Sequence, residues 1–199
     1  MRRSTRSLAG GMAIAFMLGA CGGGSSTPGT TPPAANGVEA KTWASAVCQD
    51  TLDWQNAVGQ QSATFSSIVA GAGSLDEAKA ASVSFFEGLI TRTESYLAQL
   101  RAAGTPAVTN GASLSASVIS GIQQIDEAYM AAKAKAEALT TSDATTFGQQ
   151  LSAIGADLTA ASQRIGSSIS ALSSPELETA SSDIAACQQL VSRGSSSSP

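Results

Sequence analysis

Histidine is missing from the 199 residues of this chain, and its absence excludes several kinds of site. Without imidazole there is no usual general base near neutral pH, no usual zinc or haem ligand, and no histidine-containing catalytic triad. Carboxylate-bridged di-iron bundles, which rely on Glu-x-x-His pairs, are excluded for the same reason. The sequence therefore predicts no metal, no cofactor and no catalytic residue.

Charge is scarce as well, because only 13% of the residues are charged, against about a quarter in an ordinary domain. Three of the eleven basic residues are Arg2, Arg3 and Arg6, whereas all fifteen acids lie beyond residue 20. The chain after residue 20 therefore carries eight basic and fifteen acidic residues, a net charge of −7. An acidic chain without a basic patch argues against nucleic acid as a partner. It also argues against a protein surface that adheres to anionic lipid.

The N-terminus has the features of an export signal. After a basic start, residues 8–20 are mostly apolar, and this run of 13 residues is too short to span a bilayer. It ends Leu18-Gly19-Ala20-Cys21, which resembles the lipobox of bacterial lipoproteins. The resemblance implies that the Cys21 thiol receives diacylglycerol and that a peptidase cuts between Ala20 and Cys21. An ordinary secretory leader with an incidental cysteine is the alternative.

Residues 1–20 are thus predicted to be a lipoprotein signal peptide, and the mature protein to be extracytoplasmic, lipid-anchored to the outer face of the cell membrane. Two or three acyl chains make a stable anchor. Residues 21–37 comprise the lipidated cysteine and a segment rich in Gly, Ser, Thr and Pro, for which we expect disorder. Stretched out, this linker reaches roughly 50 Å. A second disordered tail is expected over 194–199.

Between residues 38 and 193 the apolar residues recur at alternating spacings of three and four, which predicts helices. Four long helices are expected, over about 39–70, from Ser74 to about 103, from about 107 to 139, and after Asp143. Ser74 and Glu77 have the spacing of a capping box. A single short helix is expected to start at Ser174-Pro175. The fold class predicted is all-α, an antiparallel up-down four-helix bundle plus a short C-terminal helix.

Two cysteines remain in the helical domain, Cys48 and Cys187, 139 positions apart. Outside the cytoplasm such a pair is expected to form a disulfide, which would staple the last helix to the start of the first. Closing so long a loop stabilises a fold by roughly 4–5 kcal/mol in the entropic treatment. Two buried free thiols are the alternative.

Few side chains are candidates for chemistry. Asp50 and Asp53, three positions apart and next to Trp54, suit either a general acid/base pair or a weak Ca²⁺ site, and alternatively a solvated helix face. Asp126 and Glu127 form a second acidic pair that is expected on solvated helix surface. Five aromatic residues are predicted to be plain core, or else to line an apolar pocket: Trp43, Trp54, Phe86, Tyr96 and Tyr129.

The whole chain resembles a group of small lipoproteins from high-GC Gram-positive bacteria. The resemblance rests on the lipobox at Cys21, the Gly/Ser/Thr/Pro spacer, Trp43 with Val47-Cys48, Gly104-Thr-Pro106, and Ser174-Pro175-Glu176-Leu177 before Ala186-Cys187. It implies a Cys48–Cys187 disulfide and a helical domain, and no activity. This chain is richer in Ser and Ala than that group, whose members carry more acid.

These features predict a non-enzymatic interaction or ligand-binding module of the cell envelope, held to the membrane through lipid on Cys21. Its partner would be a protein or an envelope ligand. The alternative is an envelope-polymer hydrolase that uses paired carboxylates such as Asp50 and Asp53. An enzyme would hold such carboxylates in a concave site with shifted pKa values, whereas a binding module would present an apolar groove or patch.

Overall fold

The computed structural model describes residues 37–170 and 174–196. The predicted signal peptide, the Cys21 lipid site, nearly all of the linker and the last three residues lie outside them. The described part is all-helical, as predicted, and its bounds are α1 Ala40–Gly71, α2 Leu75–Ala103, α3 Gly111–Glu137, α4 Ala144–Ser170, α5 Pro175–Ser181 and α6 Ala185–Ser196. No helix among these residues is both long and apolar enough to cross a membrane.

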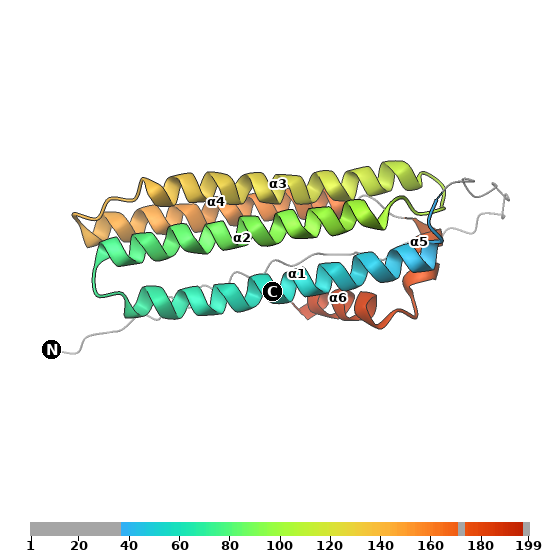
Figure 1. The fold of residues 1–199 in the computed structure, drawn as a ribbon, viewed down its shortest axis with the longest axis horizontal. Coiled ribbons are helices and arrows are strands. Elements are labelled where there is room, and N and C mark those ends of the chain that lie inside the picture. The colour runs from blue at the N-terminus through green and yellow to red at the C-terminus, as the bar shows by residue number, and fades with distance from the viewer. Residues whose placement is uncertain (1–36, 171–173, 197–199) are drawn as a thin grey trace.

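The four long helices lie alongside one another along the length of the molecule, and the two short ones lie against α1 (Figure 1). Close backbone approaches join α1 to α2, α2 to α3, and α3 to α4, and they also join α1 to both α5 and α6. One end of the molecule carries the start of α1, the connection between α2 and α3, and α5 (Figure 1). The opposite end carries the α1–α2 turn and the α3–α4 connection.

The first two helices begin where the sequence provides acceptors for their free backbone N–H groups. Glu39 is the N-cap of α1, and its carboxylate accepts from the backbone N–H groups of Lys41 and Thr42. At α2, Ser74 Oγ accepts from the N–H of Glu77, as the capping box requires. The other half of that box differs, because Glu77 accepts from the N–H of Gly73 rather than from Ser74.

The third helix begins later than predicted, at Gly111 rather than near Ala107. The intervening chain pairs with the segment before α1: Val38 N–H donates to Thr105 O, and Ala107 N–H donates to Val38 O, both at 2.7 Å. This isolated bridge pairs Pro106 with Val38, and the N–H of Val108 then donates to Pro106 O in a turn that precedes the helix. The bridge also fixes the entry of the chain into α1 beside the α2–α3 connection.

The main hydrophobic core lies between the long helices. Trp54 and Val58 of α1, Phe86, Leu89 and Leu100 of α2, Ile122, Ile125 and Ala136 of α3, and Phe147, Ile154 and Leu158 of α4 are among its buried members. These residues recur at spacings of three, four, seven and eleven, the helical period that the sequence predicted. Burial of this apolar stripe provides most of the driving force that holds the long helices together.

The C-terminal region corrects two predictions. Instead of one short helix there are two, α5 and α6, separated at 182–184. Ser181 and Ser182 donate their hydroxyls to the carbonyls of Glu178 and Thr179, a competition for backbone groups that ends helices. The chain also stays helical through Ser196, so 194–196 belong to α6 rather than to a disordered tail.

Candidate functional site

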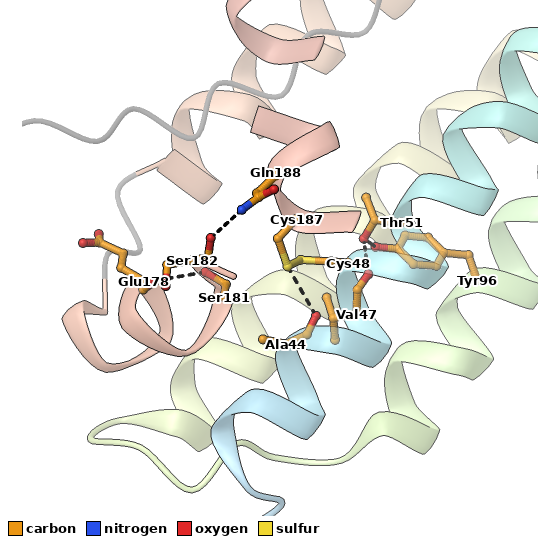
Figure 2. Close-up of a disulfide and its surroundings, with 10 residues drawn as sticks. All are labelled: Ala44, Val47, Cys48, Thr51, Tyr96, Glu178, Ser181, Ser182, Cys187 and Gln188. Carbon is orange, nitrogen blue, oxygen red and sulfur yellow. Dashed lines mark hydrogen bonds between the residues drawn. A yellow bond between two sulfur atoms is a disulfide. The ribbon is translucent and has the colours of Figure 1, made fainter. Parts of the chain in front are cut away.

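The predicted disulfide is present and joins α1 to α6 (Figure 2). Cys48 of α1 and Cys187 of α6 are joined with a Cα–Cα distance of 5.1 Å, which is within the ordinary range for such bonds. The Cys187 sulfur also lies 3.7 Å from the carbonyl oxygen of Ala44. A disulfide sulfur carries no proton, so this is a close contact rather than a hydrogen bond. The bond pins the C-terminal helix to the first long helix.

Beside the disulfide, a small polar and aromatic cluster joins α1 to α2. Thr51 Oγ1 lies 2.6 Å from Val47 O and 2.5 Å from the Tyr96 hydroxyl, as Figure 2 shows. The rings of Trp54 and Tyr96 stack with centroids 5.2 Å apart, and Trp54 Nε1 donates to Thr93 Oγ1. Burial raises the pKa of Tyr96 to about 12. Trp54 therefore packs inside the helix interface, and it is not displayed next to Asp53.

The two weak catalytic candidates, Asp50 and Asp53, have different surroundings. Asp53 is exposed and accepts from the Gln49 side chain one turn earlier on α1. Asp50 is half-buried, and loss of hydration, followed by the nearby charge of Asp53, raises the pKa of its carboxyl. Asp53 therefore lies on a solvated face, whereas Asp50 is partly withdrawn from solvent. The available signal was the position of Asp50, three residues after Val47 and four before Trp54, which is the spacing of the apolar seam.

The two residues of the second acidic pair, Asp126 and Glu127, also differ in exposure. Glu127 is exposed, as expected, whereas Asp126 is half-buried. Its Oδ1 atom is fully covered and has no hydrogen-bond partner among the described residues. Loss of hydration, then the charges of Glu94 on α2 and Glu127 on α3, raise the pKa of the Asp126 carboxyl. Asp126 is therefore a strained position in the α2–α3 interface that sequence reasoning missed.

The five aromatic residues that might have lined a pocket are all buried in the helix packing. Trp54, Phe86, Tyr96 and Tyr129 belong to the main core. Trp43 is buried at the end of the molecule, where its Nε1 donates to the carbonyl of Gly104. The prediction of plain core is confirmed for these side chains.

Metal ligands do not gather in the part of the chain that the structure describes: no group of three or more Cys, Asp or Glu side chains there is placed to hold an ion. Comparison of the chain with protein-family models, with curated proteins and with solved structures finds no match. Function must therefore be argued from the residues themselves.

Proposed function

We propose that this protein is a membrane-anchored lipoprotein of the cell envelope whose helical domain acts as a non-enzymatic interaction or ligand-binding module. The observation that carries the proposal is the Cys48–Cys187 disulfide, since disulfides persist outside the reducing cytoplasm. The Leu18-Gly19-Ala20-Cys21 sequence supplies the lipid site that would hold such a domain at the outer face of the membrane. Its partner would be a protein or an envelope ligand rather than nucleic acid.

The architecture that we propose for the module is an antiparallel up-down bundle of α1 to α4. Short connections between successive long helices, and the close approach of each helix to the next, support this topology. The tether would then join the end at Gly37, beside the α2–α3 connection. The opposite end, with the α1–α2 turn and the α3–α4 connection, would project away from the membrane. A helix of 32 residues such as α1 is about 48 Å long.

The anchor is tested by replacing Cys21 with Ser in cells that make the full precursor. We expect the variant to leave the membrane fraction, or to accumulate uncut, whereas the unchanged protein sediments with membranes and has the mass of an acylated chain. A matched Ser26→Ala variant, altered in the linker only, should fractionate like the unchanged protein. Unaltered membrane fractionation of the Cys21→Ser variant would refute the anchor.

The binding role is tested by crosslinking the anchored protein in intact cells and identifying the captured material by mass spectrometry. The expected result is a small reproducible set of envelope components, whose capture is lost when the helical domain is removed behind an intact anchor and linker. Capture that depends on the anchor alone would contradict a binding role for the domain.

The alternative, an envelope-polymer hydrolase, rests on the raised pKa of Asp50, since a carboxyl that stays protonated is what a general acid requires. The two carboxylates of this alternative, Asp50 and Asp53, however, lie on the same helix, and Asp53 already accepts a hydrogen bond from Gln49. A hydrolase would release soluble fragments from purified cell-envelope polymer and would lose that activity in an Asp50→Asn variant. We expect no release by either protein.

A further inference from the structure

The C-terminal residues 174–196, here called the strap, lie outside the main core. The buried members of that core come from α1 to α4 and, at Leu139, from the α3–α4 connection. In the strap, α5 buries no residue, and the buried side chains are those of Ser174, Ala186 and Cys187. Of the long helices, α1 is the one that α5 and α6 both approach closely. The strap is thus a separate layer that covers one side of α1.

Beneath the strap, α1 has a second apolar face. Ala44 and Leu52 are 3% and 6% exposed, yet neither belongs to the main core. With Cys48 they are spaced by four, so they lie one above another along the helix. The strap contacts this row at Ala44 and Cys48, and one turn beyond Leu52 Arg193 donates to Asn56. Leu52 therefore lies on α1 between two positions that the strap contacts, Cys48 and Asn56.

Apart from the disulfide and the buried Ala186, the strap has apolar side chains that are only partly buried, at Leu177, Ile184 and Leu190, and polar contacts at the surface. Lys41 pairs with Asp183, with side chains 54% and 63% exposed. Glu176 accepts from the N–H and hydroxyl of Thr109 at 2.8 and 3.0 Å, also in an exposed position. Exposed contacts of this kind are screened by solvent and stabilise a fold only weakly. Because most apolar side chains of the strap are only partly buried and its polar contacts are exposed, the covalent bond is the main restraint that keeps it on α1.

We propose that the Cys48–Cys187 bond is a redox clasp, whose reduction releases the strap from α1 and uncovers the Ala44–Cys48–Leu52 face while α1 to α4 stay folded. The strap already has the character of a local unfolding unit, since its hydrogen bonds are exposed and its apolar burial is slight. Its two helices are linked to each other through Gln188, which donates to the carbonyl of Ser182 (Figure 2).

The reductant is a dithiol, and the exchange begins at the more accessible sulfur. Cys48 is half-buried whereas Cys187 is 7% exposed, so the attacking thiolate bonds to the Cys48 sulfur. The sulfur–sulfur bond breaks, and Cys187 leaves as a thiolate that takes a proton from solvent. The second thiol of the reductant then displaces Cys48 as a thiol. The protein gains two electrons and two protons, and the dithiol becomes a disulfide.

The test is hydrogen–deuterium exchange of the complete mature chain, before and after treatment with dithiothreitol. On reduction we expect exchange across 174–196 to speed up by about tenfold or more, with exchange in the core of α2 and α3 unchanged. A Cys48→Ser, Cys187→Ser variant should behave like the reduced protein with no reductant present. A Lys41→Ala variant, which removes a polar contact and keeps the disulfide, should retain a protected strap.

Two results would overturn the clasp. A strap that stays protected after full reduction would show that non-covalent contacts suffice to hold it. Loss of protection throughout α1 to α4 on reduction would show that the bond supports the whole domain. The wild-type measurement decides between these outcomes even if the double variant does not fold, and it needs no knowledge of the ligand or the anchor.

Discussion

At the scale of single residues, Asp126 is the position where the fold and the side chain are least well matched. Its carboxylate has one covered, unpartnered oxygen and faces the like charges of Glu94 and Glu127. A buried acceptor without a partner costs free energy that an exposed one does not. The interface between α2 and α3 therefore tolerates this residue rather than gaining stability from it.

Replacing Asp126 with Asn should raise the free energy of unfolding at pH 7 by about 1 kcal/mol. The folded-state pKa of Asp126 is raised above its ordinary value of 3.8. Folding therefore favours the protonated form, and stability falls as pH rises from about 3.8 through that raised pKa. Urea unfolding at pH 7 and again below pH 3.8 measures both effects, and the gain should vanish at the lower pH.

The matched control for this substitution is Glu127→Gln on the exposed side of the same helix. It removes a charge near Asp126 without filling a covered position, so we expect a change below about 0.5 kcal/mol. A loss of stability in the Asp126→Asn variant at pH 7 would mean that the ionised carboxylate makes a favourable interaction in solution.

At the scale of elements, the start of α3 shows how a connection fixes a helix end. Asn110 adopts the left-handed conformation with φ of 60°, and Gly111 follows as the first helical residue. A Cβ atom on Gly111 would lie 2.0 Å from the carbonyl oxygen of Pro106. That oxygen already accepts from the N–H of Val108, and Pro106 is itself fully buried. The turn has no room for a side chain.

A Gly111→Ala substitution should therefore lower the free energy of unfolding by about 2 kcal/mol or more, because backbone rather than a mobile side chain must shift. Gly59 is the matched comparison, since a Cβ there meets no atom within 4 Å. Gly59→Ala should raise stability by about 0.5–1 kcal/mol through helix propensity. Thermal unfolding of the two variants should shift in opposite directions, and shifts of the same sign would contradict this account of the turn.

At the scale of the whole molecule, the two tyrosines report on the intact packing. They are the only tyrosines in the chain, and burial raises the pKa of both Tyr96 and Tyr129 to about 12. Unfolding restores a pKa near 10. The folded state thus favours neutral tyrosine, and the stability that this contributes is present below pH 10 and is lost as pH rises from 10 towards 12.

We expect alkaline unfolding to coincide with tyrosine ionisation. In an alkaline titration, tyrosinate absorbance should stay low near pH 10 and then rise for both residues together with loss of helical circular dichroism above about pH 11. In a Tyr96→Phe variant the remaining absorbance change should still follow unfolding. Ionisation of either tyrosine near pH 10 with helicity intact would show that its ring is solvated in the folded protein.

The helical class, the main seam residues, the Ser74 cap and the Cys48–Cys187 bond all follow from local rules. A helix periodicity, a capping residue or a cysteine count is visible within the chain itself. The split of the C-terminal helix and the late start of α3 were not visible in this way. Serine hydroxyls compete for carbonyls at the end of α5, but similar contacts occur inside the uninterrupted α1, so they do not mark a helix end in the sequence. The late start of α3 depends on pairing with Val38, which is distant in sequence.

At the candidate site, too, some features were predictable from the sequence and others depended on the packing. The sequence singled out Asp50, Asp53 and Trp54 because they are close together along the chain. The burial of Trp54 was predicted from the helical period, whereas only the packing shows that Asp53 is exposed and Asp50 is half-buried. Sequence analysis did not identify Ala44 and Leu52 as part of a second apolar face of α1. The available signal was an apolar Leu one helical turn after Cys48.

By itself, the sequence determined the proposed destination through Cys21, the acidic charge of the chain after residue 20, the exclusion of histidine chemistry, and the helices. These depend on which residues are present and on their local spacing. Only the tertiary structure decided which acid loses its water, which face of α1 lies beneath the strap, and how slightly the strap is buried. Burial is a property of neighbours brought together from distant parts of the chain, and local spacing does not specify those neighbours.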